Sequence, residues 1–314
     1  MLVLPNENLA TVKVDFKNPN STMKTKKSLP FKPVVQSFET FFSSEPQYGK
    51  YCLYELTGAK VPYHVLTHIK GPKKRTIFFF TGAIQKKIFE SPYLNRWGWA
   101  AKKEFEDMNC IYFADPTVSI PVISCGWYLW DIIKEQNKIS KIIEYYQKKL
   151  FLADDKCVFV GSSAGGYAAM YYLLNFPQCS ALVENVQTNP FEYHEFHVNN
   201  ILEGIPEIKN FGYGELDLIN LLKKSKIKSR IILIQNSNDE FHYKHFFLTA
   251  KKRLEGIKSI TFIQSDTVQN MPNTHQFVIG FNEFLEILRK LIKEQENKTL
   301  LGKINSLIKR AGNK

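Results

Sequence analysis

The sequence lacks several features that would classify it quickly. It has only five cysteines, which are scattered along the chain and form neither a CxxC pair nor a Cys/His spacing typical of zinc. No segment approaches about 18 uninterrupted apolar residues, and the first residues show no basic stretch followed by a long apolar core. These absences argue against a metal site, a membrane span and a secretory signal. They favour a reducing, cytoplasmic setting.

Negative charge is also scarce. The chain carries 42 lysines and arginines against 30 aspartates and glutamates, a formal net charge of +12. This excess favours a polyanionic partner, such as an acidic polymer or an acidic membrane surface, with a merely lysine-coated surface as the plain alternative. No helix-turn-helix, zinc-finger or RNP-like motif accompanies the charge, so we expect no nucleic acid partner.

The order of strand-like and helix-like segments predicts an α/β protein. Residues 50–58, 61–69 and 75–83 read as three strands joined by short gaps, which suits antiparallel hairpins. Further along, helical patterns alternate with strands expected at 110–116, 156–161, 181–190, 229–237 and 259–265. The alternation predicts a mostly parallel sheet with antiparallel first strands and helices on both faces.

Three regions follow from this order. We expect an N-terminal extension, 1–48, packed on a main domain, 49–296, which carries the strands. Residues 297–314 form a basic amphipathic tail, which could rest on an acidic membrane surface or on an assembly partner, or simply pack on the domain.

The small residues 161–166, "GSSAGG", lie between an expected strand and an expected helix. A Walker phosphate loop needs a lysine where Tyr167 stands, and the dinucleotide pattern GxGxxG is broken by a serine at 163. The pattern GxSxG, from Gly161 to Gly165, does fit. A serine on a sharp strand-to-helix turn is strained, and glycines two residues before and after it remove the crowding. This predicts Ser163, rather than Ser162, as a nucleophile, with a plain tight turn as the alternative.

A nucleophilic serine needs a base and an acid that orients the base, expected in loops after later strands. Asp239 follows the strand at 229–237, and His275 follows the last strand. We predict these two as acid and base, with Glu240 and Asp266 as competing acids. The remaining histidines are expected at surface, hairpin or loop positions: His64, His68, His194, His197, His242 and His245.

Acyl transfer also requires backbone donors for the oxyanion. One is expected from the N–H of Ala164, directly after the serine, and the second from Gly82 or Ala83 in the loop after the third strand. A glycine that merely turns the chain is an equal alternative at position 82.

With these residues in place, the chain resembles the α/β-hydrolase superfamily from about residue 50 to 295. The stretch "CGWYLWD" (125–131), together with Arg96 and Trp97, is similar to bacterial surface-glycan acetyltransferases. These include capsule O-acetyltransferases of the meningococcal type and glycan-acetylating proteins of accessory secretion systems. The family's usual glycine after "WYL" is Trp130 here. For Trp127 and Trp130 we expect packing in the core or a lid rather than stacking on substrate.

This resemblance implies acetyl transfer to a hydroxyl of an acidic capsular polysaccharide through an acyl-Ser163 intermediate. It implies acetyl-CoA as co-substrate, with no bound cofactor and no metal. A cytoplasmic protein is expected, with peripheral contacts to the inner membrane face or to capsule-synthesis enzymes. Ester hydrolysis by the same triad is the alternative, and a binding protein that kept the elbow without using it is a third.

Overall fold

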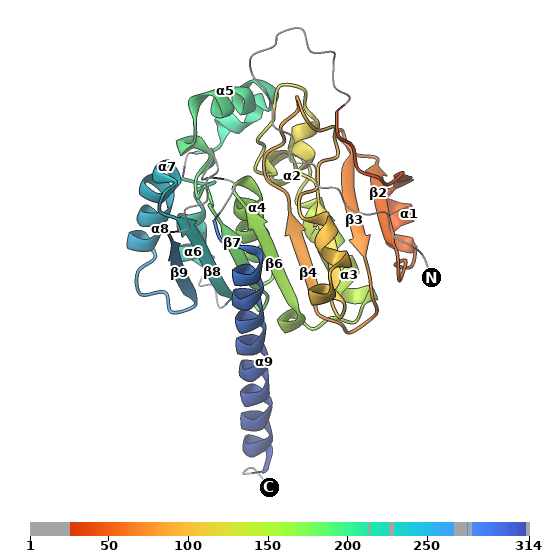
Figure 1. The fold of residues 1–314 in the computed structure, drawn as a ribbon, viewed down its shortest axis with the longest axis vertical. Coiled ribbons are helices and arrows are strands. Elements are labelled where there is room, and N and C mark those ends of the chain that lie inside the picture. The colour runs from red at the N-terminus through yellow and green to blue at the C-terminus, as the bar shows by residue number, and fades with distance from the viewer. Residues whose placement is uncertain (1–25, 213, 226–228, 267–274, 276–277, 312–314) are drawn as a thin grey trace.

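The computed structural model describes residues 26–212, 214–225, 229–266, 275 and 278–311, with only the backbone from 298 to 311. Within these residues nine strands form a single sheet in the order β1-β2-β3-β5-β4-β6-β7-β8-β9 (Figure 1). The strands are β1 (Val34–Ser37), β2 (Tyr51–Thr57), β3 (Tyr63–His68), β4 (Thr76–Phe80), β5 (Asn109–Phe113), β6 (Cys157–Ser162), β7 (Ser180–Glu184), β8 (Arg230–Asn236) and β9 (Ile260–Ser265).

Helices cover both faces of this sheet (Figure 1). The α-helices are α1 (Phe38–Ser43), α2 (Leu129–Lys134), α3 (Lys138–Lys149), α4 (Ala164–Leu173), α5 (Glu195–Gly204), α6 (Leu218–Ser225), α7 (Glu240–His242), α8 (Leu248–Arg253) and α9 (Phe281–Ala311). A π-helical turn, η7 (Tyr243–Phe247), joins α7 to α8. Short 3-10 turns are η1 (Trp97–Ala101), η2 (Lys103–Phe105), η3 (Pro116–Ser119), η4 (Asp154–Lys156), η5 (Pro190–Glu192) and η6 (Pro206–Asn210).

Two hydrophobic cores follow from the alternation of side chains along each strand. Phe78 and Phe80 of β4 face one core, with α2, α3, α4 and α6. Ile77 and Phe79 of the same strand face the other, with η1, η2 and the first half of α9. The central strands are therefore buried on both faces and read as continuous apolar runs.

The sheet confirms the expected mostly parallel arrangement with antiparallel first strands. The expected β2–β3 hairpin is present. The expected second hairpin is wrong: β3 pairs antiparallel with β5, whereas β4 lies one strand further in, parallel to β5 and β6. The short gap between β3 and β4 predicted that these two strands pair. However, an apolar strand such as β4 buries more apolar surface at the centre of the sheet, where both of its faces are covered.

The expected extension at 1–48 contributes to the sheet where it is described. β1 pairs parallel with β2 at the edge, and α1 follows it. Residues 1–25 lie outside the described part. At the other end, α9 runs past the body of the domain (Figure 1), and the expected amphipathic side chains of 298–311 lie outside the described residues. In the described part of the chain, no helix is both long and apolar enough to cross a membrane.

A buried carboxylate, Asp131 of α2, ties four elements together. It accepts hydrogen bonds from the Tyr63 hydroxyl at 2.7 Å and the Tyr172 hydroxyl at 2.5 Å. It also accepts from the backbone N–H groups of Lys138 and Ile139, which begin α3. Burial raises the pKa of Asp131, and these four donors oppose that rise. This network holds β3, α2, α3 and α4 in fixed relation, and α4 carries the candidate nucleophile at its start.

Candidate active site

Ser163 occupies a strained turn between β6 and α4. Its backbone has φ 55° and ψ −127°, a conformation that non-glycine residues rarely adopt. The turn is held because the Ser163 N–H donates to the Glu184 carbonyl at 2.9 Å and the Ser163 carbonyl accepts from the N–H of Gly166. The side chain therefore projects from the carboxyl end of β6, beside the N-terminus of α4.

The two glycines of the GxSxG pattern are required by close backbone approach. A Cβ at Gly161 would lie 2.1 Å from the Gly165 carbonyl oxygen, and a Cβ at Gly165 would lie 2.2 Å from the Phe80 carbonyl oxygen. Both distances are far below any real contact of a Cβ atom. The structure therefore requires both glycines, but the nearest atoms are the backbone of Gly165 and of Phe80 at the end of β4, rather than Ser163 as the sequence argument expected.

Asp239 and His275 are brought together, as predicted for an acid and a base. Asp239 directly precedes α7, after β8, and its Oδ2 lies 2.9 Å from Nδ1 of His275. The competing acids point elsewhere: Glu240 is exposed and pairs with Lys244, and Asp266 accepts from Ser237. Neighbouring residues 267–274 and 276–277 lie outside the described part of the chain.

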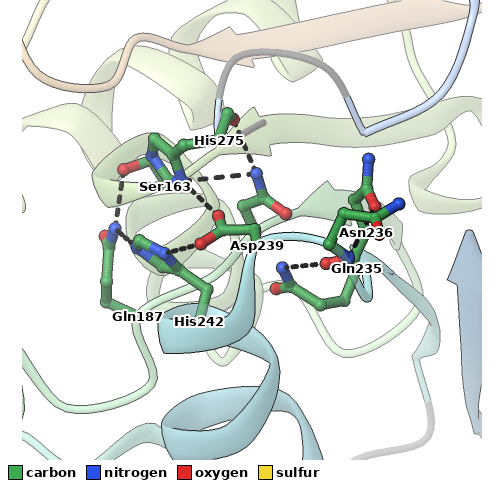
Figure 2. Close-up of polar contacts among 9 residues, drawn as sticks. Ser163, Gln187, Gln235, Asn236, Asp239, His242 and His275 are labelled. Atoms are coloured by element: carbon green, nitrogen blue, oxygen red, sulfur yellow. Dashed lines mark hydrogen bonds and ion pairs between the residues drawn. The ribbon is translucent and has the colours of Figure 1, made fainter. Parts of the chain in front are cut away.

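The structure adds a second histidine to Asp239 that the sequence argument placed at the surface. His242 is only 3% exposed, and its Nδ1 lies 2.9 Å from Asp239 Oδ1. The rings of His242 and His275 stack with centroids 4.1 Å apart (Figure 2). The surface expectation for His242 is wrong because α7 turns this residue inward. His64 and His68 lie in the β2–β3 hairpin, one of the two positions expected for them, and are buried there rather than at the surface.

The charge of Asp239 is strongly stabilised. Burial raises the pKa of this carboxyl, but the hydrogen bonds and charges of His242 and His275 outweigh burial and hold the pKa well below its usual range. Burial lowers the pKa of His242, although its contact with Asp239 opposes this. Asp239 is therefore ionised at neutral pH, and His242 is favoured in its neutral form.

Gln187 connects His242 to the serine. Its Nε2 lies 2.7 Å from Ser163 Oγ and 2.9 Å from Nε2 of His242 (Figure 2). Asp239 thus contacts His275 directly. A separate chain of hydrogen bonds links Asp239 to Ser163 through His242 and Gln187. Gln187 lies in the loop after β7, and no sequence pattern marked it. The spacing of Asp239 and His242, three residues apart at the start of a helix, was a signal for a shared face.

The three candidate oxyanion donors differ in how closely they lie to Ser163 and in their exposure. A Cβ at Gly82 would lie 3.0 Å from the Ser162 carbonyl oxygen and 3.7 Å from Ser163 Cβ, so Gly82 packs on the elbow. Ala164 is the first residue of α4, where backbone N–H groups have no partner within the helix. Ala83 follows Gly82 in the chain and is exposed.

The segment 125–131 forms hydrogen bonds with two loops of the candidate site, at Thr81 and at Gln187. The Tyr128 hydroxyl donates to the Phe113 carbonyl and accepts from the Thr81 N–H, both at 2.8 Å, and so fixes the loop that carries Gly82. Trp127 is fully buried, and its Nε1 donates to Gln187 Oε1 at 3.1 Å. Trp127 and Tyr128 both have positive φ, 48° and 60°. The packing role expected for Trp127 thus includes a polar contact with the site.

Asp239, His242 and His275 are also the one group among the described residues whose ligand atoms could converge on a metal ion. These atoms lie within 4.8 Å of one another. Each histidine is already accounted for by a hydrogen bond to the carboxylate, which is the arrangement of a general base and its orienting acid. These hydrogen bonds therefore fit acid–base chemistry.

No protein-family model matches the chain, and no curated protein matches it by sequence. Solved structures do match. The capsule O-acetyltransferase of Neisseria meningitidis serogroup A, in complex with CoA, aligns with a TM-score of 0.55 and 17% identity, over 77% of this chain and 94% of that one. The fold is that of the α/β-hydrolases.

Two further matches show how widely this fold is shared. An S-formylglutathione hydrolase of Agrobacterium tumefaciens aligns with a TM-score of 0.54 and 11% identity, over 77% of this chain and 94% of that one. A glycosylation-associated protein complex of Streptococcus agalactiae aligns with a TM-score of 0.52 and 16% identity, over 74% of this chain and 45% of that one. At such identities the α/β-hydrolase fold is what these proteins have in common with this chain.

Proposed function

We propose that this α/β-hydrolase-fold protein is a serine acyltransferase that works through an acyl-Ser163 intermediate. The observation that carries the proposal is the strained Ser163 at the elbow, in one cluster with the Asp239–His275 pair (Figure 2). A strained, glycine-flanked serine and a carboxylate-oriented imidazole together have no structural purpose as strong as nucleophilic catalysis.

The chemistry follows from the protonation states. Because ionised Asp239 can only accept, the hydrogen bond between them places a proton on Nδ1 of His275 and leaves Nε2 as its basic nitrogen. His275 Nε2 takes the hydroxyl proton as Ser163 Oγ attacks the carbonyl carbon of the acyl donor. The negative oxygen that forms is stabilised by the N–H of Ala164 and by the backbone at Gly82 or Ala83. The donor's leaving group then departs with the proton from His275.

The second half of the reaction reverses these roles. An acceptor hydroxyl gives its proton to His275 Nε2 and attacks the acyl-serine carbonyl carbon. The bond to Ser163 Oγ breaks, and Oγ regains a proton from His275. A sugar as acceptor gives acyl transfer, whereas water gives ester hydrolysis.

For the substrates, we propose acetyl-CoA as donor and an acidic cell-surface polysaccharide as acceptor. The formal charge of +12 suits a polyanionic acceptor. The meningococcal capsule O-acetyltransferase, which aligns over 94% of its length, was solved in complex with CoA, and this supports acetyl-CoA as the donor. We propose that the protein works in the cytoplasm, with peripheral contacts to the membrane or to capsule-synthesis enzymes.

The test incubates purified protein with acetyl-CoA and a panel of acidic capsular polysaccharides, with Ser163→Ala as the control. We expect free CoA to appear only when a suitable polymer is present, and acetyl groups to appear on that polymer. CoA release that is indifferent to polymer, or cleavage of simple esters alone, would favour hydrolysis. Equal activity in Ser163→Ala would refute the serine mechanism.

A further inference from the structure

Gln187 is held so that its amide can only donate toward the serine. Trp127 Nε1 is a donor and lies 3.1 Å from Gln187 Oε1, so the carbonyl of the amide must face Trp127. The NH₂ group then faces Ser163 Oγ at 2.7 Å and His242 Nε2 at 2.9 Å. Reversing the amide would place its NH₂ against another N–H donor.

His242 completes this restraint. Because the amide nitrogen of Gln187 cannot accept, Nε2 of His242 must be the unprotonated nitrogen, and Nδ1–H donates to Asp239 Oδ1. Both N–H groups of the amide are therefore used, one on His242 and one on Ser163. Gln187 and His242 are both buried, so a charged His242 would face the NH₂ group without solvent to screen it.

We infer that Gln187 is a catalytic hydrogen-bond donor to Ser163 Oγ, held by Trp127 and His242, which assists breakage of the acyl-serine bond. The inference rests on the acyl-serine mechanism proposed above. A donor on Oγ lowers the electron density of this oxygen. It therefore helps little when Oγ attacks, and it helps most when Oγ leaves and negative charge returns to it.

The atoms balance in this step. As the acceptor oxygen holds the acyl carbon, the bond from that carbon to Ser163 Oγ breaks and its electron pair goes to Oγ. His275 supplies the proton that Oγ takes, and Gln187 keeps both of its protons and donates throughout. Trp127 and His242 act as positioning residues, since each contacts the amide and neither contacts Ser163 in the hydrogen bonds described.

The experiment separates the two halves of the reaction. A fluorophosphonate probe reports attack by Ser163 alone. p-Nitrophenyl acetate reports both halves, as a burst of p-nitrophenolate followed by turnover, and intact mass spectrometry detects the acetylated enzyme. In Gln187→Met we expect probe labelling within about threefold of wild type. We expect turnover to be about 10- to 100-fold slower, an effect no larger than that of removing one oxyanion-hole donor. The acetylated enzyme should accumulate.

Matched variants make the result specific. Gln147→Met removes a glutamine side chain that bonds Asp154 on the far side of the domain, and it should leave both rates unchanged. Trp127→Phe keeps Gln187 but removes the donor that fixes the amide, so it should slow turnover in the same direction by a smaller factor. If thermal unfolding shows that Gln187→Met is not folded, Trp127→Phe serves as the test variant.

Two results would overturn the inference: equal slowing of labelling and turnover, which indicates a merely structural role, or no change in either rate. Failure of the wild-type protein to label at Ser163 would instead remove the proposed serine mechanism. The two failures are therefore distinguishable.

Discussion

Replacing Gly165 by alanine tests whether the elbow depends on close backbone contact. The added Cβ would lie 2.2 Å from the Phe80 carbonyl oxygen and 2.8 Å from the Thr81 carbonyl carbon. Real Cβ contacts essentially never fall below 3.0 Å, so the elbow and the end of β4 must separate by at least about 0.8 Å. Neither side is a flexible side chain, so the backbone must absorb the whole movement.

The expected magnitude follows from this displacement. Overpacking of a rigid site costs about 1–3 kcal/mol in the free energy of unfolding, which corresponds to a fall of roughly 2–12 °C in Tm for a domain of this size. The loop with Gly82 continues β4, so Ser163 and the oxyanion donor predicted in that loop shift relative to each other. A misplacement near 1 Å can cost about 10²-fold in rate.

The assay combines thermal unfolding with the rate of fluorophosphonate labelling of Ser163. Gly98→Ala is the matched control, because a Cβ at Gly98 meets nothing within 4 Å. We expect this control to keep both the Tm and the labelling rate of the wild type. A Gly165→Ala protein with unchanged Tm and unchanged labelling would refute the argument that backbone contact shapes the elbow.

Three further predictions concern buried charge. Asp131→Ala leaves two hydroxyls and two backbone N–H groups without their acceptor, so denaturant unfolding should show a loss of about 3–5 kcal/mol, against almost none for exposed Glu144→Ala. The pKa of His242 is lowered in the folded state, so the unfolded chain binds more protons; stability should fall as pH drops below about 6.5, and less steeply in His242→Phe. Zn²⁺ should block labelling by binding Asp239, His242 and His275, reversibly with chelator, whereas chelator alone should leave labelling intact. Inhibition by chelator alone would contradict the prediction that Ser163 reacts without a metal.

The elbow turn and the closeness of Asp239 to His275 could be predicted because each follows from a pattern that the sequence shows. Gly161 is required by contact within five consecutive residues, because a Cβ there would meet the Gly165 carbonyl, whereas Gly165 is required by its contact with Phe80 at the end of β4. Asp239 and His275 are placed by strand order, since the carboxyl ends of parallel strands meet at one edge of the sheet. The GxSxG spacing and the order of the strands can both be read from the sequence.

Gln187, the inward orientation of His242 and the central position of β4 were decided only by the tertiary structure. Gln187 was not found from the sequence because its partner Trp127 lies 60 residues earlier, and a glutamine in a loop carries no pattern of its own. His242 is buried because α7 packs its side chain among Asp239 and the aromatic ring of Tyr193. β4 does not pair with β3, the strand before it in sequence, because burial of both faces of β4 outweighs the short connection. The sequence determined the residues that local geometry constrains, whereas contacts between distant segments decided which polar groups meet them.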